Sequence, residues 1–198
     1  MECNSLSTKI GEVVKSSTDS FMAECYELHA PPSFGSLVRT REGNIDIYAV
    51  VSGASTTSVE AGRRPIARGR GDVREEDVYR SNPQLEKLLR TEFTALVVGH
   101  DDNGRVSQYM PPRPAKIHSF VYPCESDEVS MFNQSLTYLS MLIDVQERSN
   151  ELIAATLRNA AVAYPEPREF LVRAGKELAL MIAGDTNRLN IILKKVKA

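Results

Sequence analysis

The spacing of apolar residues changes once along the chain. Up to about Pro123 they come in short β-branched or alternating runs separated by Gly, Asn, Asp and Pro, whereas beyond Glu125 they recur at the spacing of one helix face. This pattern predicts an α+β protein in which a small antiparallel β-barrel of about six strands precedes a C-terminal α-helical subdomain. We place the two parts at residues 1–124 and 125–198.

Strands are predicted in the first part where apolar runs lie between turn residues, at 10–16, 20–30, 36–42, 44–54, 91–101, 105–110 and 116–124. Tight turns are expected at Glu42-Gly43-Asn44 and at Asp102-Asn103-Gly104, because Asn and Gly tolerate the positive φ that hairpin turns need. No long helical pattern separates the strands. An antiparallel barrel is therefore favoured over a βαβ sheet, and its closure would leave no exposed strand edge.

Four or five helices are expected in the second part. Ser149 begins a helix that stops at Pro165, Glu166-Pro167 opens a helix that ends at Gly184, and Asp185 caps the last one. The three apolar faces are Ile153, Leu157, Ala160, Ala161 and Tyr164; then Leu171, Ala174, Leu178 and Ile182; then Leu189, Ile192, Leu193 and Val196. Each face must be buried, either on the chain's own barrel or on a second chain, and the pattern does not decide which.

The longest polar stretch is an insertion at 55–90, between the fourth and fifth predicted strands. It exceeds the ~12–15 residues of an ordinary unstructured connection, so it is expected to contain structure or to serve a function. A short helix is predicted from Ser81-Asn82-Pro83, with an apolar side that presses on the barrel and consists of Leu85, Leu88 and Leu89. Between Arg63 and Arg80, six arginines alternate with four carboxylates, which favours self-paired arginines in a pinned loop or a protein interface over a DNA-binding arm.

Composition narrows the class of protein. The chain has 198 residues, 42% of them hydrophobic and 25% charged, and a formal net charge of -2, so it has no overall attraction to nucleic acid or anionic membrane. Three scattered cysteines and the lack of an apolar run of ~18 residues predict a cytoplasmic protein without a membrane span. Cys25 and Cys124 are expected to be buried structural thiols. Arg70-Gly71-Asp72 is then not an adhesion motif, because such motifs act outside cells.

Three stretches carry a resemblance to a known family: IGEVVKSSTDSFMAECYEL, FGSLVRTREGNIDIYAVVSGAS and EFTALVVGHDDNGRVSQYMPPRPAKIHSFVYPC. They supply a first strand that opens with Ile10-Gly11, a Gly35-x-x-Val38 start to the third strand and a Pro-rich approach to the last strand. Over residues 9–125 the chain resembles the HAS-barrel, the small β-barrel at the N-terminus of HerA-type DNA-translocating ATPases and of rotary ATP synthase subunits. The resemblance implies an assembly role, because such barrels form the collar of ring ATPases and dock partner proteins, including a nuclease in the HerA systems.

The chain departs from those families after the barrel, where they carry a RecA-like ATPase core. It has no GxxxxGK[ST] motif, and Ala174-Gly175-Lys176-Glu177 has the Gly-Lys pair inside a helical pattern. We therefore expect no enzymatic activity, no catalytic or metal-binding residues and no cofactor. The leading hypothesis is a binding or assembly module that contacts protein partners: a ring ATPase, a nuclease or copies of itself.

The predicted contact residues are cationic side chains of the insertion and of the helix that follows Pro167: Arg63, Arg64, Arg68, Arg70, Arg74, Arg168, Arg173 and Lys176. On that helix Glu169, Arg173 and Glu177 form an i, i+4 charge ladder with Lys176 beside it. Such a ladder usually marks a solvated face, and it would also suit an interface recognised by charge.

Two further functions are alternatives. The insertion arginines could bind nucleic acid together with a basic C-terminal tail of Lys194, Lys195 and Lys197, although the neighbouring carboxylates disfavour this and lysines also suit a helix C-terminus. His100-Asp101-Asp102 could form the metal centre of a hydrolase, although these residues also suit a hairpin turn. Pro111-Pro112-Arg113-Pro114 is interpreted as an extended crossover to the last strand in preference to a polyproline ligand.

Overall fold

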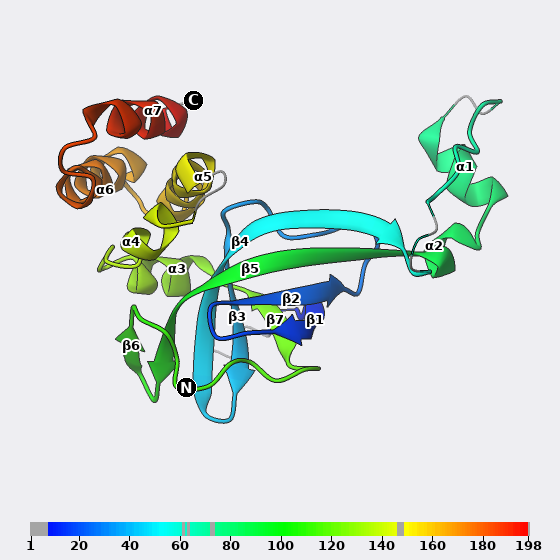
Figure 1. Cartoon of the computed structure of the whole chain (residues 1–198), viewed down its shortest axis with the longest axis horizontal. Helices are drawn as coiled ribbons and strands as arrows, with labels where there is room; N and C mark the ends of the chain where they lie inside the picture. The colour runs from blue at the N-terminus through cyan, green and yellow to red at the C-terminus, as the bar shows by residue number, and fades with distance from the viewer. Residues whose placement is uncertain (1–7, 61, 63, 72–73, 146–148, 198) are drawn as a thin grey trace.

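The structure is a computed structural model that describes residues 8–60, 62, 64–71, 74–145 and 149–197. A β-barrel occupies the middle of the molecule, a group of helices lies at one end of its longest axis, and a projection tipped by two short helices lies at the other (Figure 1). The strands are β1 (Gly11–Ser16), β2 (Ser20–Cys25), β3 (Leu37–Glu42), β4 (Ile45–Ser58), β5 (Leu89–Asp102), β6 (Arg105–Ser107) and β7 (Phe120–Pro123). The helices are α1 (Glu75–Ser81), α2 (Leu85–Leu88), α3 (Ser126–Phe132), α4 (Leu139–Ile143), α5 (Ser149–Ala161), α6 (Pro167–Met181) and α7 (Thr186–Val196).

All strands except β6 form a closed antiparallel barrel. Around the barrel the order is β1, β2, β5, β4, β3 and β7, and β7 pairs again with β1. β6 adds to the end of β5. The helices α3 to α7 follow the barrel in sequence. The predicted α+β class, a small barrel followed by C-terminal helices, is therefore confirmed.

Alternation along the strands fills the barrel with apolar side chains. On β4, Ile47, Ala49 and Val51 belong to the interior and are fully buried, as the period-two geometry of a strand requires. The pairing of β4 with β5 shifts in register at two places, and such bulges let a long strand coil around a barrel. The interior consists of Val13, Phe21, Ala23, Cys25, Val38, Ile47, Ala49, Val51, Phe93, Ala95, Val97, Ala115 and Val121.

Both predicted hairpin turns are present, but some strands are shorter than their patterns. Gly43 has φ +61°, and Asn103 and Gly104 have φ of 53° and 87°. β2 ends at Cys25, because His29 takes φ 65° and the prolines at 31 and 32 have no N–H to donate to a ladder. Residues 108–110 and 116–119 also lie outside strands, the latter because His118 has φ 69° and breaks the extended backbone.

The C-terminal helices fold onto the chain's own barrel. Leu37, Tyr48, Val50 and Val98 belong to barrel strands, and their side chains form one continuous core with apolar residues of α3, α4, α5, α6 and α7. The rings of Tyr48 and Phe132 have their centroids 4.9 Å apart across this junction. The sequence left open whether these helices pack on their own barrel or on a second chain. In the structure they pack on their own barrel.

α5 lies at the centre of the helical part. It contacts α4, α6 and α7, and a Cβ added to Gly35, before β3, would lie 2.7 Å from the Cβ of Ala155 on α5. The buried set therefore extends beyond the predicted stripe and includes Leu152, Ala154, Ala155 and Thr156. On α6 the buried face is Phe170, Ala174 and Leu178, with Leu171 only partly buried. Asp185 caps α7 as predicted, since its side chain accepts from the Arg188 N–H at 2.9 Å.

Candidate functional site

β4 and β5 continue beyond the barrel as a two-stranded ribbon. β5 pairs with both β2 and β4 as far as Glu92, whereas residues 89–91 pair with residues 56–58 of β4 alone. The strands thus run past their predicted ends at 54 and 91, and the Oγ1 atoms of Thr56 and Thr91, 2.8 Å apart, join the added pairs. We call the described part of residues 59–88 the arm; it contains α1 and α2, and the ribbon carries it away from the barrel (Figure 1).

The arm does not press a helix on the barrel as predicted. The predicted short helix is present as α2, and the turn before it begins at Asn82, whose carbonyl accepts from the Leu85 N–H at 3.0 Å. Asn82 itself ends α1, because the residue before proline disfavours the helical conformation, and it has φ -136° and ψ 63°. α2 has no buried residue. Leu85, Leu88 and Leu89 line a small hollow of about 40 Å³ within the arm, so they stabilise the arm itself.

His29 and Tyr79 connect the arm to the barrel. The His29 N–H donates to Thr91 Oγ1 at 2.8 Å, and the His29 ring nitrogen Nε2 lies 2.6 Å from the Tyr79 hydroxyl. The two rings meet edge to face with centroids 5.6 Å apart. No sequence pattern indicates this contact, because His29 lies in a predicted strand and Tyr79 lies among charged residues.

The arm presents arginines to solvent. Arg64, Arg68, Arg70 and Arg74 are all exposed, and Arg68 Nη1 donates to Asn82 Oδ1 at 3.3 Å. Arg63, and with it Asp72 of the Arg-Gly-Asp sequence, lies outside the described residues.

The predicted pairing of arginines with carboxylates is observed in the arm for Arg80 and Asp77, whose charged atoms lie 3.0 Å apart. Within the described part of the chain, Arg64, Arg70 and Arg74 form no ion pair. As far as the described residues show, these three guanidinium groups are available to a partner.

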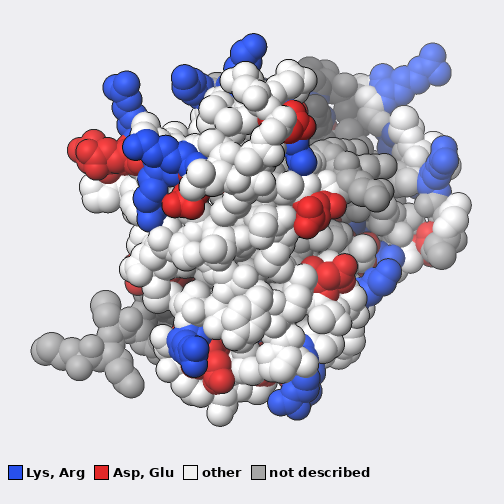
Figure 2. Space-filling view, turned by 60° about the vertical axis from the view of Figure 1, so that its left-hand side comes forward, with Lys and Arg blue, Asp and Glu red and all other residues white. Residues whose placement is uncertain are grey.

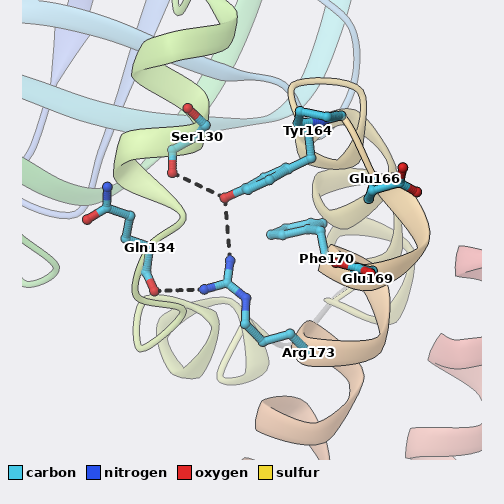
Figure 3. Close-up of a pocket in the computed structure, with 8 residues that line it drawn as sticks. Ser130, Gln134, Tyr164, Glu166, Glu169, Phe170 and Arg173 are labelled. Atoms are coloured by element: carbon cyan, nitrogen blue, oxygen red, sulfur yellow. Dashed lines mark hydrogen bonds between the residues drawn. The ribbon is translucent and has the colours of Figure 1, made fainter.

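A groove of about 620 Å³ lies at the opposite end of the molecule, between α3 and the start of α6 (Figure 3). We call it the α6 groove. The rings of Tyr164 and Phe170 stack in it with centroids 4.4 Å apart and an angle of 14° between their planes. The Tyr164 hydroxyl donates to the carbonyl of Ser130 at 3.1 Å, and burial raises the pKa of Tyr164. The lining residues are Ser130, Gln134, Tyr164, Pro165, Glu166, Glu169, Phe170 and Arg173.

Arg173 crosses the α6 groove instead of joining a charge ladder. Its guanidinium donates to the carbonyl of Gln134 at 3.0 Å (Figure 3). It also donates to the carbonyl of Asn133 at 2.9 Å, and its Cζ lies 5.5 Å from the centroid of the Phe170 ring. These carbonyls follow the last turn of α3, where helix geometry leaves oxygens without partners. The predicted ladder is therefore wrong at Arg173, because the carbonyls take up its donors.

Glu166 and Glu169 leave the groove with unpaired negative charge. Glu166 precedes α6 and its side chain does not cap the helix, and Glu169 lies in the first turn. Both are exposed, and neither carboxylate has an ion-pair partner among the described residues. From the sequence alone, Glu166 is only a helix start and Glu169 only a member of the charge ladder.

The other predicted contacts on α6 lie beside this groove. Arg168 and Lys176 are exposed, and with Glu169, Val172 and Arg173 they line a second hollow of about 360 Å³. The structure thus places the arginines of the arm and the cations of α6 at opposite ends of the molecule, and they do not form one site (Figure 1). On the face that Figure 2 shows, acidic and basic side chains are interspersed around a large uncharged area, without a continuous basic stripe.

The side chains of Asp101 and Asp102 support the β5–β6 turn. Asp101 Oδ1 accepts from the Gly104 N–H at 2.6 Å, and Asp102 Oδ1 accepts from the Asn103 side chain at 2.7 Å. His100 is buried, with Nδ1 3.2 Å from the carbonyl oxygen of Tyr109. Among the residues that the structure describes, no group of three or more His, Cys, Asp or Glu side chains is placed to hold a metal ion.

Cys25 and Cys124 are free thiols, the first buried as predicted and the second half-buried. Cys25 is buried in the barrel, and burial raises the pKa of its thiol to about 11. Burial also raises the pKa of Cys124 well above its ordinary value. Both thiols are therefore protonated near neutral pH.

The remaining motifs occupy ordinary structural positions. Gly175 and Lys176 lie in the middle of α6, so they form no phosphate-binding loop. Lys194 and Lys195 lie in the last turn of α7, and Lys195 pairs with Glu151. The segment 111–114 crosses between β6 and β7 as expected.

None of the described helices has both the length and the apolar character that crossing a bilayer requires. In comparisons with known proteins, no family model matches the chain, and no curated protein matches it significantly.

Proposed function

We propose that the chain is a non-catalytic binding and assembly module whose arm contacts a protein partner. One observation carries this proposal: the β4–β5 ribbon holds exposed arginines clear of the barrel, at the end opposite the helices (Figure 1). A loop that only connects two strands would not need a two-stranded ribbon, two helices and a hydrogen bond between His29 and Tyr79. Cationic arginine is also the charged side chain most enriched in protein interfaces.

The rest of the molecule agrees with a scaffold role. Apolar side chains fill the barrel, and the helices bury their apolar faces on it. From the resemblance to HAS-barrels, the proposed partners are a ring ATPase of the HerA type, an associated nuclease, or copies of the same chain.

The test is affinity capture from the native cell with arginines of the arm replaced by alanine. The arm variant carries Arg64→Ala, Arg68→Ala and Arg70→Ala, and the matched control removes three exposed cations elsewhere, Lys15, Arg105 and Arg113. We expect the control to retain its partner and the arm variant to lose it. Equal recovery by both variants would contradict the proposal.

Nucleic acid is the competing ligand of the arm, because Arg64, Arg70 and Arg74 are exposed without ion-pair partners among the described residues. The described carboxylates of the arm, including Glu76 and Asp77, oppose such binding. A salt titration with DNA separates the two functions. Steeply salt-dependent binding would favour the nucleic-acid role, and no binding at low salt would remove it.

A further inference from the structure

A cavity of about 150 Å³ lies at the junction of the barrel and the helices, and we call it the junction cavity. Its walls come from the start of β3, the end of β7, α3 and α5, so both parts of the molecule contribute to it. Protein interiors leave few voids larger than a water molecule, and a space of this order can hold a molecule of the size of benzene. The lining residues are Gly35, Ser36, Leu37, Pro123, Cys124, Val129, Asn133, Tyr138, Thr156, Asn159 and Ala160.

The residues around the junction cavity form a buried and a half-buried set. Thr156 and Ala160 are buried, whereas Ser36, Cys124 and Asn159 are half-buried. The cavity is thus a recess with a buried floor, and it opens to solvent on the side of the half-buried residues.

The wall of the junction cavity is uncharged. Among the described residues that line it, none has an ionisable carboxylate, ammonium, guanidinium or imidazole. Two of the charged residues that influence the Cys124 thiol, Arg39 and Glu128, pair with each other at 2.7 Å. Because an ion that leaves water for uncharged surroundings loses its hydration without compensation, the cavity favours uncharged molecules.

Two buried side chains supply polar groups to this wall. Thr156 Oγ1 donates to the carbonyl of Leu152 at 2.8 Å, and Asn133 Nδ2 donates to the carbonyl of Val129 at 2.8 Å. The hydroxyl oxygen keeps its lone pairs as acceptors, and the amide nitrogen has a second N–H to donate. A ligand group that both donates and accepts, such as a hydroxyl or an amide, suits this pair, and the side chains of Leu37 and Val129 suit an apolar ring.

We infer that the junction cavity binds a small uncharged molecule, about the size of one six-membered ring, that carries a hydroxyl or amide group. Ligand sites commonly lie between two parts of a protein and combine an apolar lining with a few polar groups. Such a ligand contacts the barrel and the helices together, so its binding stabilises their junction. The site includes no residue of the arm, and it is therefore a function beyond the proposed assembly role.

Titration of the purified full chain, followed by two-dimensional amide NMR, tests the inference. The probes are benzamide and phenol, and benzoate is the charged counterpart of benzamide with nearly the same shape. We expect both uncharged probes to shift the amide signals around the junction cavity in a saturable way, with dissociation constants in roughly the millimolar range that small ligands reach. Benzoate should bind at least about tenfold more weakly, because its charge has no counter-charge there.

Variants of α5 and its end locate the bound probes. Ala160→Leu fills part of the junction cavity and should abolish binding, whereas Val162→Leu enlarges a side chain that is 81% exposed and should leave binding unchanged. Thr156→Val removes one hydroxyl at nearly constant shape and should weaken benzamide binding about fivefold, as the loss of one hydrogen bond implies. The amide spectrum of each variant without probe shows whether it is folded.

Three results would overturn the inference: neither uncharged probe binds saturably, benzoate binds as tightly as benzamide, or the Ala160 variant binds benzamide like the wild type. If the Ala160 variant does not fold, the Thr156 variant decides in its place, and an unchanged affinity for benzamide then overturns the inference. None of these results bears on the capture of a partner through the arm, which is measured separately with the alanine variants.

Discussion

The imidazole Nε2 of His29 lies 2.6 Å from the hydroxyl oxygen of Tyr79 and thereby fastens α1 of the arm to the segment that follows β2. The two residues are 50 positions apart in the sequence. The arm is therefore held in place by a residue that lies outside it. This hydrogen bond and the β4–β5 ribbon hold the arm in position.

Tyr79→Phe should loosen the arm without unfolding the barrel. A hydrogen bond of this kind contributes ~0.5–1.5 kcal/mol, so the amides of α1 should exchange with solvent roughly fivefold faster, while the melting temperature changes little. Hydrogen exchange read by mass spectrometry measures this. Tyr109→Phe is the control, since Tyr109 is an exposed tyrosine outside the arm. Equal effects of both changes on the exchange of α1 would show that the Tyr79 hydroxyl does not hold the arm.

Gly35→Ala should destabilise the whole fold. Gly35 has φ +81°, and an added Cβ would lie 2.7 Å from backbone and side-chain atoms of Ala155 and from the Thr156 nitrogen. The strained backbone and the forced separation from α5 together cost roughly 2–4 kcal/mol. Gly43→Ala is the matched control, because Gly43 has φ +61° but open space around it, so only the conformational cost of about 1 kcal/mol applies. Urea unfolding compares the two, and similar losses would show that the contact with α5 is not tight.

Arg173→Lys should lower the free energy of unfolding by about 1–3 kcal/mol. A lysine cannot reach both the Asn133 and Gln134 carbonyls in the planar geometry of arginine. Arg168→Lys, on the same helix, is the control, because Arg168 has no described partner. An unchanged unfolding midpoint for the Arg173 variant would place its guanidinium in solvent.

The Cys25 thiol should make stability fall at high pH. Burial raises its pKa from the ordinary 9.0 to about 11, so the folded protein retains a proton that the unfolded chain releases. The contribution is full below pH 9 and is lost as the pH rises through about 11. Urea midpoints measured across this range should decline more for wild type than for Cys25→Ala. Identical slopes for the two proteins would contradict the assignment.

Local patterns were sufficient to predict much of the fold. The strand β4, the positive-φ turn at Asn103-Gly104 and the Asp185 cap depend on neighbours in sequence, and all three are present as expected. What failed depended on tertiary partners. The length of the ribbon depends on the pairing of Thr56 with Thr91, which are far apart in sequence. The role of Arg173 depends on carbonyls that follow a different helix.

The candidate site was predictable only in part. The arginine-rich composition singled out residues of the arm, whereas nothing local showed that the β4–β5 ribbon would hold the arm clear of the barrel. The α6 groove was missed because its members, such as Ser130 and Tyr164, come from separate helical segments. A tyrosine directly before Pro165-Glu166-Pro167 marks a helix end, and such an end exposes an aromatic ring to the next helix.

The central claim, that the arm is the contact surface, is tested most directly by a photo-crosslinking amino acid placed at Ile66 in the native cell. The control carries the same group at Lys15, an exposed position outside the arm. We expect a discrete crosslinked species from position 66, whether to a second copy or to another protein, and none from position 15. Crosslinks from position 15 with none from position 66 would contradict it.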